Sequence, residues 1–106
     1  MAQKLDPTVA SAIALQYASA VKKDFLLRQM FLFGSTSSGT AEEDSDIDIA
    51  VIAEDFTGDV VDDIFRLKKS RRKIDLRIEP HAFLPSDFHA GNPFAAEIMR
   101  TGIRIV

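Results

Sequence analysis

Apolar residues along this chain repeat with two periods, one typical of helices and one typical of strands. After Asp6 and Pro7, which suit the cap and the first position of a helix, apolar residues recur at helical spacing. They are Val9, Ile13, Tyr17, Ala20 and Val21. This stripe predicts a helix that ends between Lys23 and Leu27.

Strand-like runs lie between the helical patterns. Residues 30–33 and 47–53 are short and nearly all apolar, as expected for strands that are covered on both faces. Residues 73–79 alternate charged and apolar side chains, which predicts a strand with one wet face. Residues 103–106 suggest a short closing strand.

Two further helices complete the pattern. Residues 57–71 carry acids early and bases late, as the helix dipole prefers. A last helix through residues 93–99 is preceded by Asn92 and closed by Gly102. Strands that alternate with helices indicate an α/β fold. We expect a small mixed sheet of about four strands flanked by helices, in a single domain over residues 1–106.

The composition agrees with one small globular domain. The chain has 106 residues, of which 46% are hydrophobic, and this suffices for one core. The absence of cysteine and of a signal-peptide core leads us to expect a cytoplasmic protein. No apolar stretch approaches a membrane span. The net charge of −3 argues against a general nucleic-acid coat protein, although nucleic acid is not excluded as a partner.

The most informative stretch joins a glycine turn to two carboxylates. Gly34 follows a buried strand and lets the backbone approach a ligand closely. The Ser35 hydroxyl and the neighbouring N–H groups can face phosphate oxygens. Asp46 and Asp48 flank Ile47, so strand alternation points both carboxylates to one side. Mg²⁺ or Mn²⁺ would relieve their mutual repulsion and would share coordination with phosphates.

A third carboxylate, Asp75, lies in the alternating run 73–79. If that strand pairs beside the strand of Asp46 and Asp48, Asp75 projects toward them on the wet face. The simpler alternative is that Asp75 is a structural surface residue. Together the three carboxylates suggest metal-dependent phosphoryl or nucleotidyl transfer.

Two other motifs begin in a similar way, but this chain lacks a residue that each of them requires. A P-loop would need a lysine after the second glycine, where Thr40 stands. A calcium loop that begins at Asp44 would need a glycine where Ile49 stands. An acidic surface loop remains an alternative for Asp46 and Asp48, and it is the interpretation we prefer for Glu42, Glu43 and Asp44.

Gly34-Ser35 followed by Ser45-Asp46-Ile47-Asp48-Ile49 resembles the signature of the DNA polymerase beta-like nucleotidyltransferase superfamily, in particular its minimal, MNT-type members. The resemblance covers most of the chain and includes Ile74-Asp75-Leu76 and Thr101-Gly102-Ile103. It implies that Asp46, Asp48 and Asp75 are catalytic and bind two divalent ions. It also implies that Gly34, Ser35 and Ser45 contact a nucleoside triphosphate, of which ATP is our choice.

One departure from the family pattern concerns a phosphate contact. Many relatives carry an arginine between the Gly-Ser pair and the second glycine, whereas this chain has Thr36-Ser37-Ser38. The resemblance further implies a HEPN-type toxin as partner, with this chain as the antitoxin that nucleotidylates it. The competing hypothesis is a neutralising subunit that keeps the fold and occludes its partner. Transfer to a small molecule is disfavoured because no acceptor domain follows, and a homo-oligomer is left open.

The remaining chemistry-bearing residues suggest structural roles. The basic residues at the end of the second helical pattern are expected to form a solvated helix end, where the helix dipole favours positive charge. His81 and His89 lie in turn-rich sequence, so we expect both at the surface. Three phenylalanines are expected to pack rather than to stack on bases; they are Phe83, Phe88 and Phe94.

Overall fold

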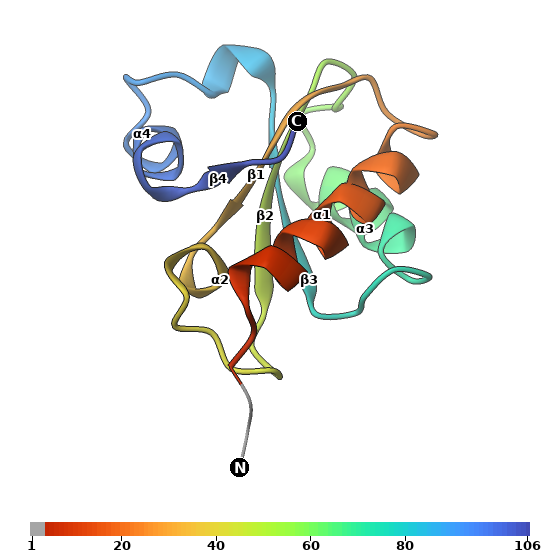
Figure 1. The fold of residues 1–106 in the computed structure, drawn as a ribbon. Helices are drawn as coiled ribbons and strands as arrows, with labels where there is room; N and C mark the ends of the chain where they lie inside the picture. The colour runs from red at the N-terminus through yellow and green to blue at the C-terminus, as the bar shows by residue number, and fades with distance from the viewer. Residues whose placement is uncertain (1–3) are drawn as a thin grey trace.

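A computed structural model describes residues 4–106 of the chain, which fold into a four-stranded mixed sheet with helices on both faces (Figure 1). The order along the chain is α1 (Pro7–Val21), β1 (Leu27–Phe33), α2 (Ser35–Ser38), β2 (Ile47–Ala53), α3 (Val60–Ser70), β3 (Ile78–Phe83), the 3-10 turn η1 (Pro85–Asp87), α4 (Pro93–Thr101) and β4 (Ile103–Arg104). The predicted α/β fold with about four strands is confirmed.

The order of strands in the sheet is β3-β2-β1-β4. β1 runs antiparallel to both β2 and β4, whereas β2 and β3 are parallel and are connected through α3. β2 is therefore central, and its burial on both faces explains its continuous apolar sequence. The antiparallel pairing brings the end of β1 beside the start of β2, with Phe33 opposite Asp48.

Two cores lie on opposite faces of the sheet. The larger core packs α1 and α3 against one face and contains Tyr17, Leu32, Ile47, Ile49 and Leu67. The smaller core packs α4 and Phe88, which follows η1, against the other face. It contains Phe31, Ala50, Ile52, Phe83, Phe88, Ala95 and Ile98. The burial of Phe83 and Phe88 confirms their predicted packing role.

The first helix begins and ends close to its predicted limits, but its buried stripe is rotated. The Asp6 carboxylate caps it by accepting a 2.7 Å hydrogen bond from the Thr8 N–H. Its buried positions are Ala10, Ala14, Tyr17, Ala18 and Val21, whereas Val9 is 51% exposed. Small alanines let the helix approach the sheet closely, and this signal is weaker in sequence than that of larger apolar residues.

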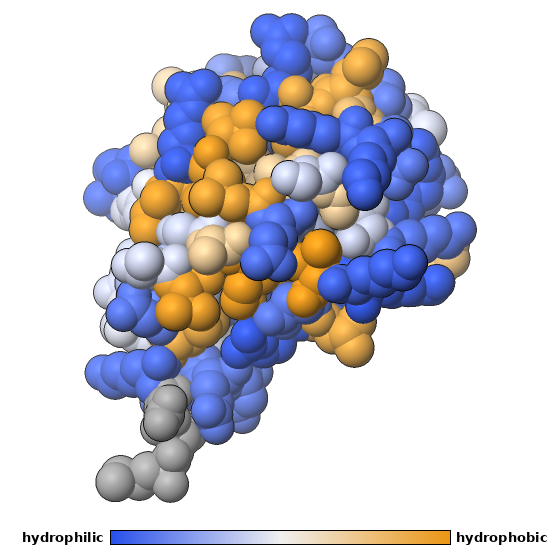
Figure 2. Space-filling view, turned by 45° about the vertical axis from the view of Figure 1, so that its right-hand side comes forward, coloured by the Kyte–Doolittle hydropathy of each residue, from blue (hydrophilic) through white to orange (hydrophobic). Residues whose placement is uncertain are grey.

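The face shown in Figure 2 carries apolar patches interleaved with hydrophilic side chains. Within residues 4–106, none of the helices is both long and apolar enough to cross a membrane.

Candidate functional site

The Gly34 turn is shaped by a conformation that side chains oppose. β1 ends at Phe33, and Gly34 has φ 72° and ψ −149°, outside the range that L-residues readily adopt. A Cβ atom built on Gly34 would lie 2.8 Å from Oδ2 of Asp48. The backbone of the turn and the second motif carboxylate are therefore in close contact, with no room for a side chain between them.

Asp46 and Asp48 lie at the start of β2, beside the Gly34 turn that follows β1. Ile47 and Ile49 are fully buried in the larger core, so strand alternation directs Asp48 to the opposite face. The Asp48 side chain is 29% exposed, and Asp46 is exposed just before the strand. The Ile47 N–H donates to the Arg77 carbonyl at 2.8 Å and fixes the beginning of the strand.

The prediction of a strand over residues 73–79 is wrong, and with it the predicted placement of Asp75. β3 begins only at Ile78, and Asp75 lies in the turn before it. The Asp75 carboxylate accepts hydrogen bonds from the backbone and guanidinium of Arg77 at 2.7–3.0 Å. These bonds hold the pKa of Asp75 below its ordinary value, against the opposing effect of partial burial.

Glu79 occupies the place beside Asp48 that the sequence suggested for Asp75. In the parallel pairing of β2 with β3, Asp48 is in register with Glu79, and Ala50 is in register with His81. Registered residues on parallel neighbours project to the same face. Alternation with Ile78, Pro80 and Ala82 indicates from the sequence that Glu79 and His81 share one strand face. The register with Asp48 comes from the pairing of β3 with β2.

His81 is half-buried beside the carboxylate rather than free at the surface. Its Nε2 lies 3.2 Å from Oδ1 of Asp48, and its side chain is 32% exposed. Its ring also meets Phe33 edge-on, with 5.0 Å between ring centroids, and Phe94 at 5.9 Å. These contacts fix the imidazole and, through it, the orientation of Asp48. His89, in contrast, is exposed as predicted.

A hollow of about 370 Å³ runs along β3 with Glu79 and His81 in its wall. Its apolar lining comes from α3, β3 and α4, through Val60, Ile64, Pro80, Ala82, Phe83 and Phe94. Phe94 is 45% exposed and packs against Phe33 at 5.6 Å between ring centroids. The hollow provides space beside His81, the residue that contacts Asp48.

The hydroxyl groups around the turn mainly stabilise the turn itself. Thr36, which is fully buried, donates to the Phe33 carbonyl at 3.1 Å, and Ser37 donates to the Gly34 carbonyl at 3.0 Å. The Ser45 hydroxyl accepts a 2.9 Å hydrogen bond from the Glu42 N–H. Ser45 thus shapes the loop that leads to Asp46. Ser35 is half-buried at the first position of α2.

The oxygen ligands suit a hard divalent cation. Carboxylates of Asp46, Asp48 and Glu79 are the donor type that Mg²⁺ and Mn²⁺ prefer. In the described part of the chain, no three His, Asp or Glu side chains already stand close enough together to hold a metal ion. Asp46 and Glu79 are exposed enough to adopt other rotamers.

Comparison with known proteins identifies the same fold. The family model described as nucleotidyltransferase domain matches residues 16–101. A Sulfolobus solfataricus protein assigned as a nucleotidyltransferase is 21% identical, with a TM-score of 0.59 over 76% of this chain and 72% of that one. None of the curated proteins compared with the chain matches it.

Two toxin–antitoxin crystal structures are also similar. One, with AMP-PNP, has a TM-score of 0.60 and 21% identity and covers 86% of this chain and 70% of that one. The other, a mutant of MntA–HpeT, has a TM-score of 0.60 and 20% identity and covers 84% of this chain and 68% of that one.

Proposed function

Because the chain belongs to the nucleotidyltransferase domain family, we propose that it transfers a nucleoside monophosphate, AMP from ATP, to a hydroxyl group on a partner protein. The observation that carries the proposal is the close approach of the Gly34 turn to the Asp48 carboxylate. A bare turn supplies backbone N–H groups for phosphates, and the carboxylate beside it supplies metal ligands.

The turn binds the triphosphate in this mechanism. The Ser37 and Ser38 N–H groups of α2 already donate to the Gly34 carbonyl. The N–H groups of Ser35 and Thr36, at the first two positions of the helix, are therefore the ones that we assign to phosphate oxygens. Ser35 adds a hydroxyl donor at the same place. The positions where relatives carry an arginine are occupied here by hydroxyl residues of the turn, so the backbone carries a larger share of phosphate binding.

Asp46 and Asp48 hold the divalent ions in the proposal, with Glu79 as the third carboxylate. When bound, such ions neutralise the triphosphate and lower the pKa of the acceptor hydroxyl. His81 keeps the Asp48 carboxylate in a fixed orientation through its 3.2 Å contact. Asp75, predicted as the third ligand, instead acts through its bonds to Arg77 on the loop that leads into β3.

The chemical step is an in-line displacement at the α-phosphorus. The acceptor oxygen forms a bond to that phosphorus while the bond to the β-phosphate oxygen breaks, and pyrophosphate leaves. The hydroxyl proton passes to a carboxylate of the site, for which Glu79 is placed. Positioning and charge neutralisation dominate such reactions, so few protein groups are required.

The partner follows by analogy with the structural neighbours. Two of them are toxin–antitoxin structures, one with AMP-PNP. We propose that this chain is the antitoxin of such a pair and that the acceptor hydroxyl belongs to a HEPN-type toxin. The hollow along β3 provides an entrance for an acceptor side chain beside Glu79 and His81.

The test is transfer of label from ATP. The chain is incubated with α-labelled ATP, Mg²⁺ and the product of the adjacent reading frame, and intact mass is measured. We expect one chain to gain the mass of a nucleoside monophosphate. Asp48→Asn should abolish this gain, whereas the exposed loop variant Asp44→Asn should retain it. Undiminished transfer by Asp48→Asn excludes the mechanism.

A catalytically silent binding subunit is the second candidate. The absence of the usual motif arginine and the engagement of Asp75 by Arg77 favour it. MgATP binding separates the two functions, because a ligand that binds only the folded state raises the melting temperature. A thermal shift that EDTA removes supports the transferase, and no shift supports the silent subunit.

A further inference from the structure

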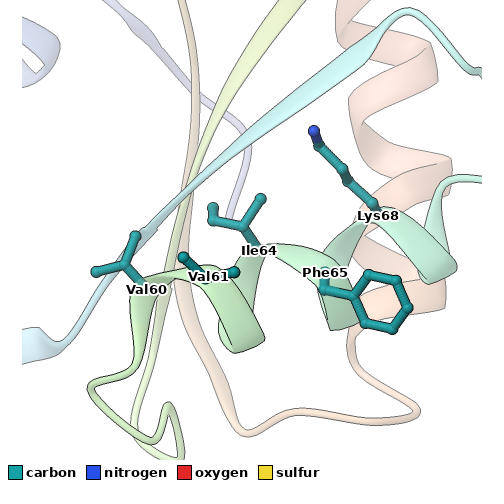
Figure 3. Close-up of a pocket in the computed structure, with 5 residues that line it drawn as sticks. All are labelled: Val60, Val61, Ile64, Phe65 and Lys68. Atoms are coloured by element: carbon teal, nitrogen blue, oxygen red, sulfur yellow. The ribbon is translucent and has the colours of Figure 1, made fainter.

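The outward side of α3 carries apolar side chains that the fold leaves uncovered. Val61 is 80% exposed, Val60 65% and Phe65 54%, although Leu67 on the inward side is fully buried. Together with Ile64 and Lys68 they line a hollow of about 360 Å³ (Figure 3). Large apolar residues that cluster on one exposed helix face mark an interaction site more often than single ones do.

Charged residues on this same helix face have opposite signs at its two ends. Asp62 is exposed in the first turn, and Lys69 is exposed in the last turn. Asp62 and Lys69 are seven positions apart, which corresponds to about two turns, so both side chains lie along the same side of the face with Phe65 between them. Asp63, next in sequence to Asp62, is instead buried and accepts hydrogen bonds from Thr57 and Gly58.

Such a face is complementary to itself when reversed. In a two-fold pair of antiparallel helices, residues that lie equally far on either side of the axis meet across it. A two-fold axis near Phe65 would bring Asp62 of each copy to Lys69 of the other copy, twice per pair. The two Phe65 rings would lie between these ion pairs, and each Val61 side chain would lie just beyond them, next to Asp62.

We propose that α3 is a homodimer surface, on which a second copy of this chain packs its own α3 antiparallel through Val61 and Phe65. Neither charge has a strong competing partner in the described residues. The Lys69 ammonium lies 4.7 Å from the centroid of the Phe65 ring of the same copy, which places the ammonium at the edge of the apolar face. The nearby contact between Lys68 and Glu79 is 3.8 Å long, and the two side chains are 40% and 39% exposed, so it restrains Lys68 little.

The apolar requirement is tested by sedimentation equilibrium of the full chain over a range of concentrations. The wild type should dimerise, and Phe65→Asp should weaken dimerisation by at least about tenfold in dissociation constant. Leu15→Asp is the matched control, because Leu15 on α1 is 53% exposed. That variant should dimerise as the wild type does. Circular dichroism and thermal unfolding establish that both variants are folded.

The ion-pair register is tested by a charge swap. Asp62→Lys and Lys69→Asp should each weaken the dimer, since each creates like charges across the axis. The double variant restores opposite charges in reversed order and should dimerise again. A partner of different sequence would not produce this rescue.

Each contrary outcome overturns the proposal. A monomeric wild type leaves the α3 face to a chemically different partner. A dimer that Phe65→Asp leaves intact lies on another surface, and single variants that the double swap does not rescue contradict the antiparallel register. Molecular mass is measured without nucleotide, so these outcomes are independent of the transfer reaction.

Discussion

Gly34 and Asp48 are in contact across the end of β1 and the beginning of β2: a Cβ on Gly34 would lie 2.8 Å from Oδ2 of Asp48. Gly34 also has φ 72°, so two independent constraints, a backbone conformation and a close approach, require glycine at this position. The same contact brings the backbone of the turn and the carboxylate that we propose as a metal ligand into one site.

Gly34→Ala should therefore cost both stability and activity. A positive φ costs an L-residue about 1–2 kcal/mol, and the new methyl group would also push the Asp48 carboxylate aside. Gly58→Ala is the matched control, since Gly58 has φ 89° with no atom within 4 Å of a built Cβ. Urea unfolding should show a loss in both variants, while ATP-dependent labelling should fail in Gly34→Ala alone. Retained labelling in Gly34→Ala would contradict the role of the contact.

Replacing Glu79 by glutamine should mainly lower activity, whereas replacing Asp75 by asparagine should mainly lower stability. Glu79→Gln should lower the labelling rate by at least about a hundredfold with little loss of stability, because the side chain is a proposed metal and proton acceptor. Asp75→Asn should lower stability by about 1–2 kcal/mol through its lost bonds to Arg77 and leave most activity. The labelling rates of the two variants and the wild type are compared at saturating Mg²⁺ and ATP. The opposite pattern would indicate that Asp75, and not Glu79, is the third metal-binding carboxylate.

The acid dependence of stability should reveal the Asp75–Arg77 pair. Bonding to Arg77 lowers the pKa of Asp75 below its ordinary 3.8 in the folded state. A lowered pKa contributes stability that is present above 3.8 and is lost as pH falls through the folded-state value. Asp75→Asn should thus lose less stability than the wild type as pH falls from 3.8 through the lowered pKa of Asp75. Urea midpoints followed from neutral to acid pH provide the measurement, and parallel curves would refute the pairing.

His81 should act as a positioning residue for Asp48. His81→Phe keeps an aromatic ring for the contacts with Phe33 and Phe94 but removes the 3.2 Å contact with Asp48. Loss of such a supporting group typically costs about 10–100-fold in metal affinity or activity. We expect the Mg²⁺ concentration for half-maximal labelling to rise by this factor, while unfolding changes little. An unchanged Mg²⁺ dependence would assign His81 to packing alone.

The sequence predicted the centre of the fold better than its edge. Residues 47–53 form a continuous apolar run because β2 is buried on both faces, and Gly34 marks the turn through its backbone freedom. At the edge strand β3 the alternating pattern was extended too far toward the N-terminus. Asp75 and Arg77 satisfy each other within a turn, and no local pattern distinguishes that from a strand.

Pro80 interrupts the strand pattern of β3 in the sequence. Proline lacks an N–H and is usually taken as the end of a strand, but an edge strand tolerates it because one side makes no sheet hydrogen bonds. β3 is such an edge strand, with Pro80 in register with Ile49. The parallel register that sets Glu79 and His81 beside Asp48 arises from pairing between distant segments, which composition and periodicity do not encode.

Tyr17 should report the integrity of the larger core at alkaline pH. It is the only tyrosine in the chain, it is fully buried, and its hydroxyl donates to the Leu67 carbonyl of α3 at 2.8 Å. Burial raises its pKa far above the ordinary 10.0, with a smaller opposing effect from Arg71. The unfolded chain therefore ionises above pH 10 while the folded chain keeps its proton. This stabilising contribution is present below pH 10 and is lost as pH rises through the raised value.

Two measurements test this expectation. The ultraviolet absorbance of phenolate should appear together with alkaline unfolding and not at the ordinary pKa, because one side chain gives the whole signal. Tyr17→Phe should be about 1 kcal/mol less stable at neutral pH through the lost hydrogen bond. Its stability should also fall less steeply than that of the wild type above pH 10, although lysine titration affects both chains. A phenolate that titrates near pH 10 in the folded protein would show that α1 and α3 do not enclose this side chain.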